Sequence, residues 1–193
     1  TMSDDDWSTI AYVYQSFVTA GPDITYNFTQ GPGRGYGFGR GRMPTYAELQ
    51  VETDSAMVHR GYLATETNFR ALKALETNNL VVPLVGDFAG PKAIHDVGVY
   101  LKDHNATVTA FYLSNVEQYL FQDDVWRRFY TNVGTLPLDS TSTFIRSVFN
   151  VMGFNNYGPM RGQQLLASMM EQVTLFNDGK LTSYPDVIAT SRQ

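Results

Sequence analysis

The sequence predicts an α/β fold, in which helices flank a partial parallel sheet, and three observations support this expectation. The composition is that of a globular protein, because hydrophobic residues make up 43% of the chain and charged residues 17%. Two short apolar runs, 80–85 and 107–113, are typical of strands that are buried on both faces. A helical pattern follows each run, and a third strand is expected over 142–149. Strands that alternate with helices indicate right-handed crossovers and a parallel sheet.

Helices are predicted before, between and after these strands. The first is expected over residues 4–20, because Ser3 and Asp6 form an S-x-x-D capping signal. Pro83 argues against the first strand, since proline removes one hydrogen-bond donor from a ladder. Further helices are expected from Thr45, over 66–78, over 91–103, from Ser114, over 123–132, over 163–177 and, as a short turn, over 185–190.

The chain is expected to form a single domain, 1–193, with a flexible Gly/Arg-rich loop at 31–42. Glycine occupies every second position of this loop, so ordering it would cost much conformational entropy. Its arginines, Arg34, Arg40 and Arg42, alternate with aromatic residues and allow two interpretations. One is a nucleic-acid contact, and the other, which the acidic remainder of the chain favours, is an insertion with solubilising charges.

Charge and composition exclude several functional classes. The net charge of −5 argues against nucleic acid as the main partner. The chain has no cysteine and therefore no disulfide or thiolate metal site, and its 3 histidines lack the spacing of a metal site. No apolar run is long enough to span a membrane. The first residues do not resemble a signal peptide and look internal to a longer chain, so a cytoplasmic protein without a membrane partner is expected.

Polar side chains gather where the first two predicted strands end. Asp87 and Gly90 follow the first run, directly before a helix whose free N–H groups can attract a polar ligand. The alternative is that Asp87 only caps this turn and Gly90 only relieves a steric clash. The carboxyl ends of neighbouring parallel strands meet at one edge of a sheet. This turn should therefore open onto the same crevice as the end of the second strand.

The end of the second strand carries five side chains that can take part in hydrogen bonds. A capping box would explain two of them, Ser114 and Glu117, without any ligand. It would leave the asparagine and the two tyrosines unexplained, so a binding role is expected for the whole segment. The five residues are Tyr112, Ser114, Asn115, Glu117 and Tyr119.

One arginine, Arg146, lies within the otherwise apolar third strand. A charge in such a position needs a partner or a ligand, and the alternative is an edge position that faces water. If Asp87 and Glu117 share a pocket, their repulsion should raise one pKa or demand a cation. Lys92 and Arg146 are the nearest cations by sequence.

Long segments of the chain resemble a bacterial family of uncharacterised proteins. They are MPTYAEL (43–49), GYLATETNF (61–69), NLVVPLVGDFAGPKAI (79–94), VTAFYLSNVEQYLF (108–121), STFIRSVF (142–149) and LTSYPDVI (181–188). Members of that family are similar in fold to S-adenosylmethionine-dependent methyltransferases, so the resemblance implies a partial Rossmann-like, methyltransferase-like sheet. It also implies that this chain is the C-terminal part of a longer protein, because the family's upstream Gly-rich turn and acidic strand, which would hold the cofactor, are absent. Asp87 with its turn and the segment 114–120 are the site positions that carry over.

The expected function is that of a methyltransferase-like protein that binds a small polar or nucleotide-type ligand at the carboxyl edge of the sheet. S-adenosylmethionine is expected as a cofactor of the full-length protein and no cofactor for this chain alone. A non-catalytic binding or scaffold domain is the main alternative. A hydrolase that uses Ser114 or Asp87 is a third possibility.

Overall fold

A computed structural model describes residues 2–25, 44–148 and 163–192. The chain forms two compact units, residues 1–82 and residues 83–193. The Gly/Arg-rich loop predicted at 31–42 lies outside the described residues. The single domain expected over the whole chain stays a prediction.

The first helix of the N-terminal unit begins and ends where the sequence predicts. This helix, α1, spans Asp4–Ala20. The Ser3 hydroxyl accepts a hydrogen bond from the Asp6 N–H, and the Asp6 carboxylate accepts one from the Ser3 N–H. This capping box satisfies N–H groups that would otherwise lack partners at the helix start. A short 3-10 turn, η1 (Gly21–Asp23), follows the helix.

Two further helices of this unit start after threonine caps. The helix α2 spans Tyr46–Gln50, and the hydroxyl of Thr45 accepts a hydrogen bond from the Glu48 N–H. The helix α3 spans Glu66–Thr77 and is capped in the same way by Thr65. The predicted starts of both helices are confirmed, because side-chain capping is a local interaction that the sequence alone reveals.

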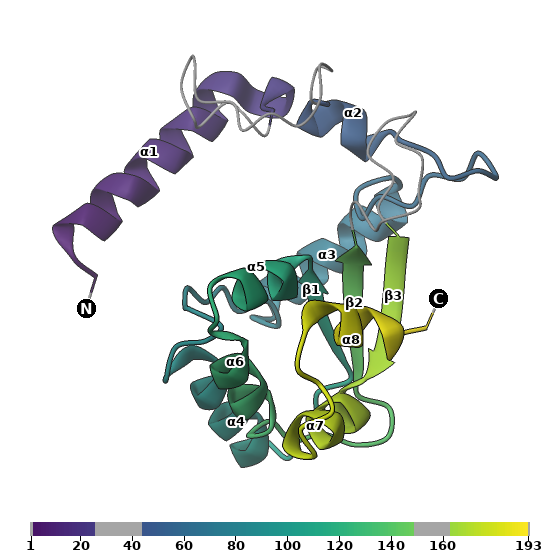
Figure 1. Cartoon of the computed structure of the whole chain (residues 1–193). Coiled ribbons are helices and arrows are strands. Elements are labelled where there is room, and N and C mark those ends of the chain that lie inside the picture. The colour runs from purple at the N-terminus through teal and green to yellow at the C-terminus, as the bar shows by residue number, and fades with distance from the viewer. Residues whose placement is uncertain (1, 26–43, 149–162, 193) are drawn as a thin grey trace. The chain divides into compact units, whose positions relative to one another are not determined.

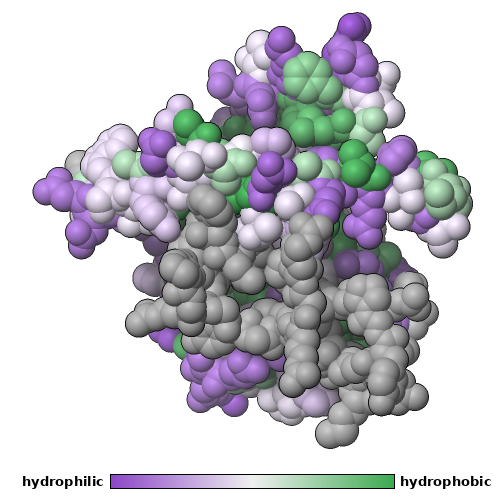
Figure 2. Space-filling model, turned by 90° about the horizontal axis from the view of Figure 1, so that it is seen from above, coloured by the Kyte–Doolittle hydropathy of each residue, from purple (hydrophilic) through white to green (hydrophobic). Residues whose placement is uncertain are grey.

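Few side chains of the N-terminal unit are buried. In the described part of this unit, only Ser16 and Ile24 are buried. Large apolar side chains instead reach the surface, and Figure 2 shows hydrophobic residues at the surface in several places on one face of the protein. Among the described residues, no helix has both the length and the apolar character that crossing a bilayer requires.

The apolar run 80–85 is not a strand, and this prediction was wrong. The run belongs to no sheet, and its aliphatic side chains are exposed, Val85 completely so. Pro83 lacks the N–H group that a ladder position needs. A strand buried on both faces also requires neighbours on each side, and the composition of the run alone does not supply them.

The C-terminal unit contains a three-stranded mixed sheet (Figure 1). Its strands are β1 (Ala110–Ser114), β2 (Thr143–Val148) and β3 (Gln163–Ser168), in the order β1-β2-β3. The pair β1 and β2 is parallel, whereas β2 and β3 are antiparallel. The predicted α/β class is therefore confirmed, while the expectation of a wholly parallel sheet is corrected.

The strand β3 lies where the sequence predicts the start of a helix. The expected helix over 163–177 is shorter, because only Met169–Asn177 are helical and form α7. The preceding residues pair along the whole of β2, and this long-range pairing overrides their local helical pattern. The hydroxyl of Ser168 then accepts a hydrogen bond from the Glu171 N–H and caps α7.

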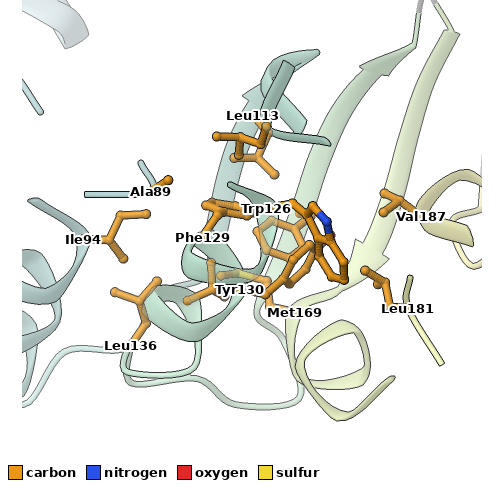
Figure 3. Close-up of a cluster of buried hydrophobic side chains, with 13 residues drawn as sticks. Ala89, Ile94, Leu113, Trp126, Phe129, Tyr130, Leu136, Met169, Leu181 and Val187 are labelled. Carbon is orange, nitrogen blue, oxygen red and sulfur yellow. The ribbon is translucent and has the colours of Figure 1, made fainter. Parts of the chain in front are cut away.

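Helices pack around the sheet and form a core that is centred on one of them. The remaining helices of this unit are α4 (Ala93–Asp103), α5 (Val116–Gln122), α6 (Trp126–Val133) and α8 (Tyr184–Ala189). Three α6 side chains, Phe129, Tyr130 and Val133, have no exposed surface. Figure 3 shows core side chains from α4, β1, α6 and α7 that converge on this helix.

Gly86 allows the segment before α4 to approach that helix closely. A Cβ atom at Gly86 would lie 2.3 Å from the Cβ of Ala93, which is too short for any real contact. We therefore expect Gly86→Ala to lower the free energy of unfolding by about 1–3 kcal/mol, as overpacking does. Urea unfolding measures this change.

The matched control is Gly134→Ala. The new Cβ would meet its neighbours only at 3.4 Å or more. This substitution should be neutral or stabilise the protein by up to about 1 kcal/mol. Equal losses of stability in the two variants would contradict the close approach at Gly86.

Candidate functional site

Two of the residues predicted to bind a ligand are bound to each other in the core. Arg146 on β2 and Glu117 on α5 are both buried and form an ion pair. The Arg146 Nε donates to Glu117 Oε2, and the Arg146 Nη2 donates to Glu117 Oε1 at 3.1 Å. Two parallel hydrogen bonds between a guanidinium and a carboxylate are the strongest arrangement available to such a pair.

Other buried groups complete the hydrogen bonds of this pair. The Tyr130 hydroxyl donates to Glu117 Oε1 at 2.5 Å. The Arg146 Nη1 donates to the Ser191 hydroxyl at 3.0 Å, and its Nη2 donates to the Gln172 side-chain oxygen at 3.3 Å. Both charges therefore have several partners, as charges removed from water must have.

The surroundings keep Arg146 charged. Burial alone would lower the pKa of Arg146, but the negative charge of Glu117 and the hydrogen bonds to it outweigh burial and hold that pKa above its usual value. Burial raises the pKa of Tyr130 well above its usual value, and the charge of Glu117 adds to this effect. Tyr130 consequently remains a hydrogen-bond donor throughout the ordinary pH range, and the buried cluster joins β2, α5, α6 and α7.

The geometry decides between the alternatives predicted for Arg146 and for the capping box of Ser114 and Glu117. Arg146 does need a partner, as expected, and the water-facing position is wrong because the side chain is buried. The capping box of Ser114 and Glu117 is also wrong. The N-cap of α5 is Asn115, which makes no side-chain capping bond, and Ser114 ends β1 with a positive φ of 51°.

The predicted turn at Asp87 and Gly90 forms, but its polar groups have local partners. The Asp87 Oδ1 accepts a hydrogen bond from the Ala89 N–H at 2.8 Å. The Asn132 side chain of α6 donates to the carbonyls of Phe88 and Gly90, which ties the turn to the core. The geometry is that of a turn capped by Asp87.

The predicted pairing of carboxylates is therefore not observed. Glu117 is joined to Arg146, whereas Asp87 caps its own turn. Lys92, the other cation considered, forms an ion pair with Asp96 on the same helix.

The two tyrosines predicted at the end of the strand 107–113 are at the surface. Tyr112 and Tyr119 are exposed, and the Tyr112 hydroxyl lies 3.4 Å from the Ser147 hydroxyl. The Gln164 side chain also donates to Ser147, at 2.8 Å. These contacts form a polar row across β1, β2 and β3 and leave the tyrosine rings accessible.

The C-terminal unit contains an apolar pocket that the sequence did not predict as a site. Its volume of about 360 Å³ is at the small end of the range for ligand pockets. The walls come from the segment 84–88, from α4, from β1 with the residues before it, and from the residue Leu136 that follows α6. The lining residues are Leu84, Gly86, Phe88, Ala93, Ile94, Val97, Leu101, Val108, Ala110, Phe111 and Leu136.

A weak signal of this pocket is present in the sequence. Leu84, Gly86 and Phe88 are alternate residues of one segment, and all three line the pocket. Alternation is the pattern of an extended chain that turns one side toward an apolar surface. The predicted strand ends at residue 85, whereas the alternation continues to Phe88 and forms one wall of the pocket.

The described residues contain no cluster of metal-ligating side chains, and two of the histidines have local partners. In these parts of the chain, no three His, Asp or Glu side chains are close enough together to hold a metal ion. His104 Nδ1 lies 2.7 Å from the Tyr100 carbonyl, and His95 lies beside Asp96. Neither histidine has a serine or threonine hydroxyl as its hydrogen-bond partner.

Comparison with known proteins gives a family without a known activity. Residues 32–178 match the profile of a family that is described as a domain of unknown function, DUF7790. No curated protein matches the sequence.

The buried ion pair leads to a stability prediction. We expect Glu117→Gln to lower the free energy of unfolding by about 3–5 kcal/mol, because it leaves the Arg146 charge buried without a counter-charge. The double variant Glu117→Leu with Arg146→Met should lose much less, since it removes both charges and fills the space with apolar atoms. Urea unfolding of the two variants measures the difference. A loss below about 1 kcal/mol for Glu117→Gln would mean that water or an anion reaches the Arg146 guanidinium.

Proposed function

This chain belongs to the DUF7790 family, and we propose that its C-terminal unit is a non-catalytic binding domain whose ligand occupies the apolar pocket. The observation that supports this proposal is the pocket itself. It is a concave, preformed, apolar cavity, which is the usual form of a small-molecule site.

The chemistry of the walls defines the class of ligand. Ile94, Val97 and Leu101 of α4 form an aliphatic wall, and Phe88 and Phe111 contribute two aromatic rings whose centroids are 5.9 Å apart. A flat, largely apolar molecule matches these surfaces, because aromatic and aliphatic contacts stabilise it without unpaired polar groups. This ligand is less polar than the nucleotide-type molecule that the sequence suggests.

The absence of a catalytic role rests on what the polar groups already do. Glu117 and Arg146, the strongest candidates for chemistry, satisfy each other, and Asp87 caps its own turn. A general base must reach a substrate proton, and neither Glu117 nor Asp87 is among the residues that line the pocket.

A methyl-transfer function is the second candidate. It is favoured by one observation, the parallel pair of β1 and β2 with the helices α5 and α6 between them in sequence. This strand–helix–strand unit is the building block of Rossmann-like sheets. S-adenosylmethionine would be the cofactor.

The experiment compares two phenylalanine substitutions on α4. Val97 lines the pocket, whereas Val99 on the same helix is exposed. With the apolar fluorophore 1-anilinonaphthalene-8-sulfonate as the probe, we expect Val97→Phe to weaken binding at least tenfold and Val99→Phe to leave it unchanged. The added ring in Val97→Phe fills space that the probe needs.

Calorimetry with S-adenosylmethionine separates the two candidates. We expect this chain to bind the cofactor weakly or not at all. In the fluorophore experiment, equal probe binding by Val97→Phe and Val99→Phe would refute the pocket as the binding site. Cofactor affinity near about 1 μM, a binding free energy of about −8 kcal/mol, would instead support the methyl-transfer function.

A further inference from the structure

The helix α1 carries a continuous apolar stripe that is exposed. Trp7, Ile10, Tyr14, Phe17 and Val18 are 60%, 44%, 70%, 53% and 58% exposed. Their spacing of three and four residues places them on one face of the helix. In the described residues, only Ser16 of this helix is buried.

Such a stripe is unusual for a surface that faces water alone. Single exposed apolar residues are common, but a contiguous apolar patch on a soluble protein marks an interaction site. A helix of 17 residues is also only marginally stable by itself, because most helical stability comes from packing of the apolar face. Both arguments indicate that the stripe is covered in the functional state.

We propose that α1 pairs with α1 of a second copy of this chain in an antiparallel arrangement. The area available is sufficient for such a pair. Given these exposed fractions, covering the three aromatic and the two aliphatic side chains on both copies would bury about 1,000 Å². A specific interface needs roughly this area, and casual contacts between molecules bury less than about 800 Å².

Charge selects both the partner and the orientation. The first turn of α1 contains Asp4, Asp5 and Asp6, and the helix contains no lysine or arginine. Helices that lie on membranes attract anionic lipids through basic residues, so this helix is unsuited to a lipid surface. A parallel pair would bring six carboxylates together, whereas an antiparallel pair separates the two acidic turns by about 25 Å. That separation exceeds the Debye length of about 8 Å at physiological salt.

An antiparallel pair also matches the stripe with itself. In a two-fold arrangement the same face serves both copies, and a residue near one end contacts a residue near the other. Trp7 would lie close to Phe17 and Val18 of the second copy, and Ile10 close to its Tyr14. The large side chains near each end of the helix would thus face aliphatic and aromatic groups instead of water.

Sedimentation velocity of the full chain over a range of concentrations tests the proposal. The wild-type protein should show a concentration-dependent shift from monomer to dimer. Tyr14→Glu introduces a charge in the middle of the stripe and should raise the dimer dissociation constant at least tenfold. Thr9→Glu adds the same charge to the same helix, but on the polar face, and should leave the dissociation constant unchanged. Circular dichroism confirms that each variant keeps its helical content.

Three outcomes would overturn the proposal. The first is a wild-type protein that stays monomeric at all concentrations. The second is a wild-type monomer whose melting temperature falls in Tyr14→Glu but not in Thr9→Glu, which would mean that the stripe packs within the same chain. The third is co-sedimentation of the wild-type protein with vesicles of anionic phospholipid that Tyr14→Glu abolishes, which would make a lipid surface the partner. Each result is independent of whether the apolar pocket binds the fluorescent probe.

Discussion

The ion pair of Arg146 and Glu117 is the interaction on which the C-terminal unit depends. Removing two charges from water costs several kcal/mol for each ion, and the pair is tolerated only if every remaining donor and acceptor finds a partner. Those partners come from different elements: β2 supplies the arginine, α5 the glutamate, α6 Tyr130 and α7 Gln172. The position of each element is thereby tied to the others, because displacing any one of them would leave a buried charge without its hydrogen bond.

This constraint also limits what the unit can do chemically. The sequence offers Glu117 and Arg146 as ligand contacts at the end of a strand, yet both side chains are buried and hydrogen-bonded to each other. Exposed side chains such as Tyr112 and Tyr119 remain accessible for polar contacts. The pocket of the C-terminal unit is apolar. This arrangement supports the proposal that the domain binds a ligand without catalysis.

The parts of the structure that the sequence predicts correctly are those that local interactions determine. The caps at Ser3, Thr45 and Thr65 place three helices, because a side chain that binds an N–H group three residues away leaves a clear pattern. The need of Arg146 for a partner is also predictable, since burial in an apolar strand follows from its neighbours. The errors involve distant partners. The run before Gly86 looks like a strand but lacks a neighbour, and the residues of β3 look helical but pair with β2.

The pocket was not predicted for a related reason, because the alternation of Leu84, Gly86 and Phe88 marks only one of its walls. Three small residues on separate elements, Gly86, Ala93 and Ala110, line it, and no local pattern connects them. Atoms that line an unfilled space lack dispersion contacts on one side, so a cavity lowers the stability of a protein that is stable by only about 5–15 kcal/mol. At Gly86 even one added carbon does not fit, because its Cβ atom would lie 2.3 Å from the Cβ of Ala93. A pocket beside the core of α6, where Phe129, Tyr130 and Val133 have no exposed surface, is therefore a local departure from close packing.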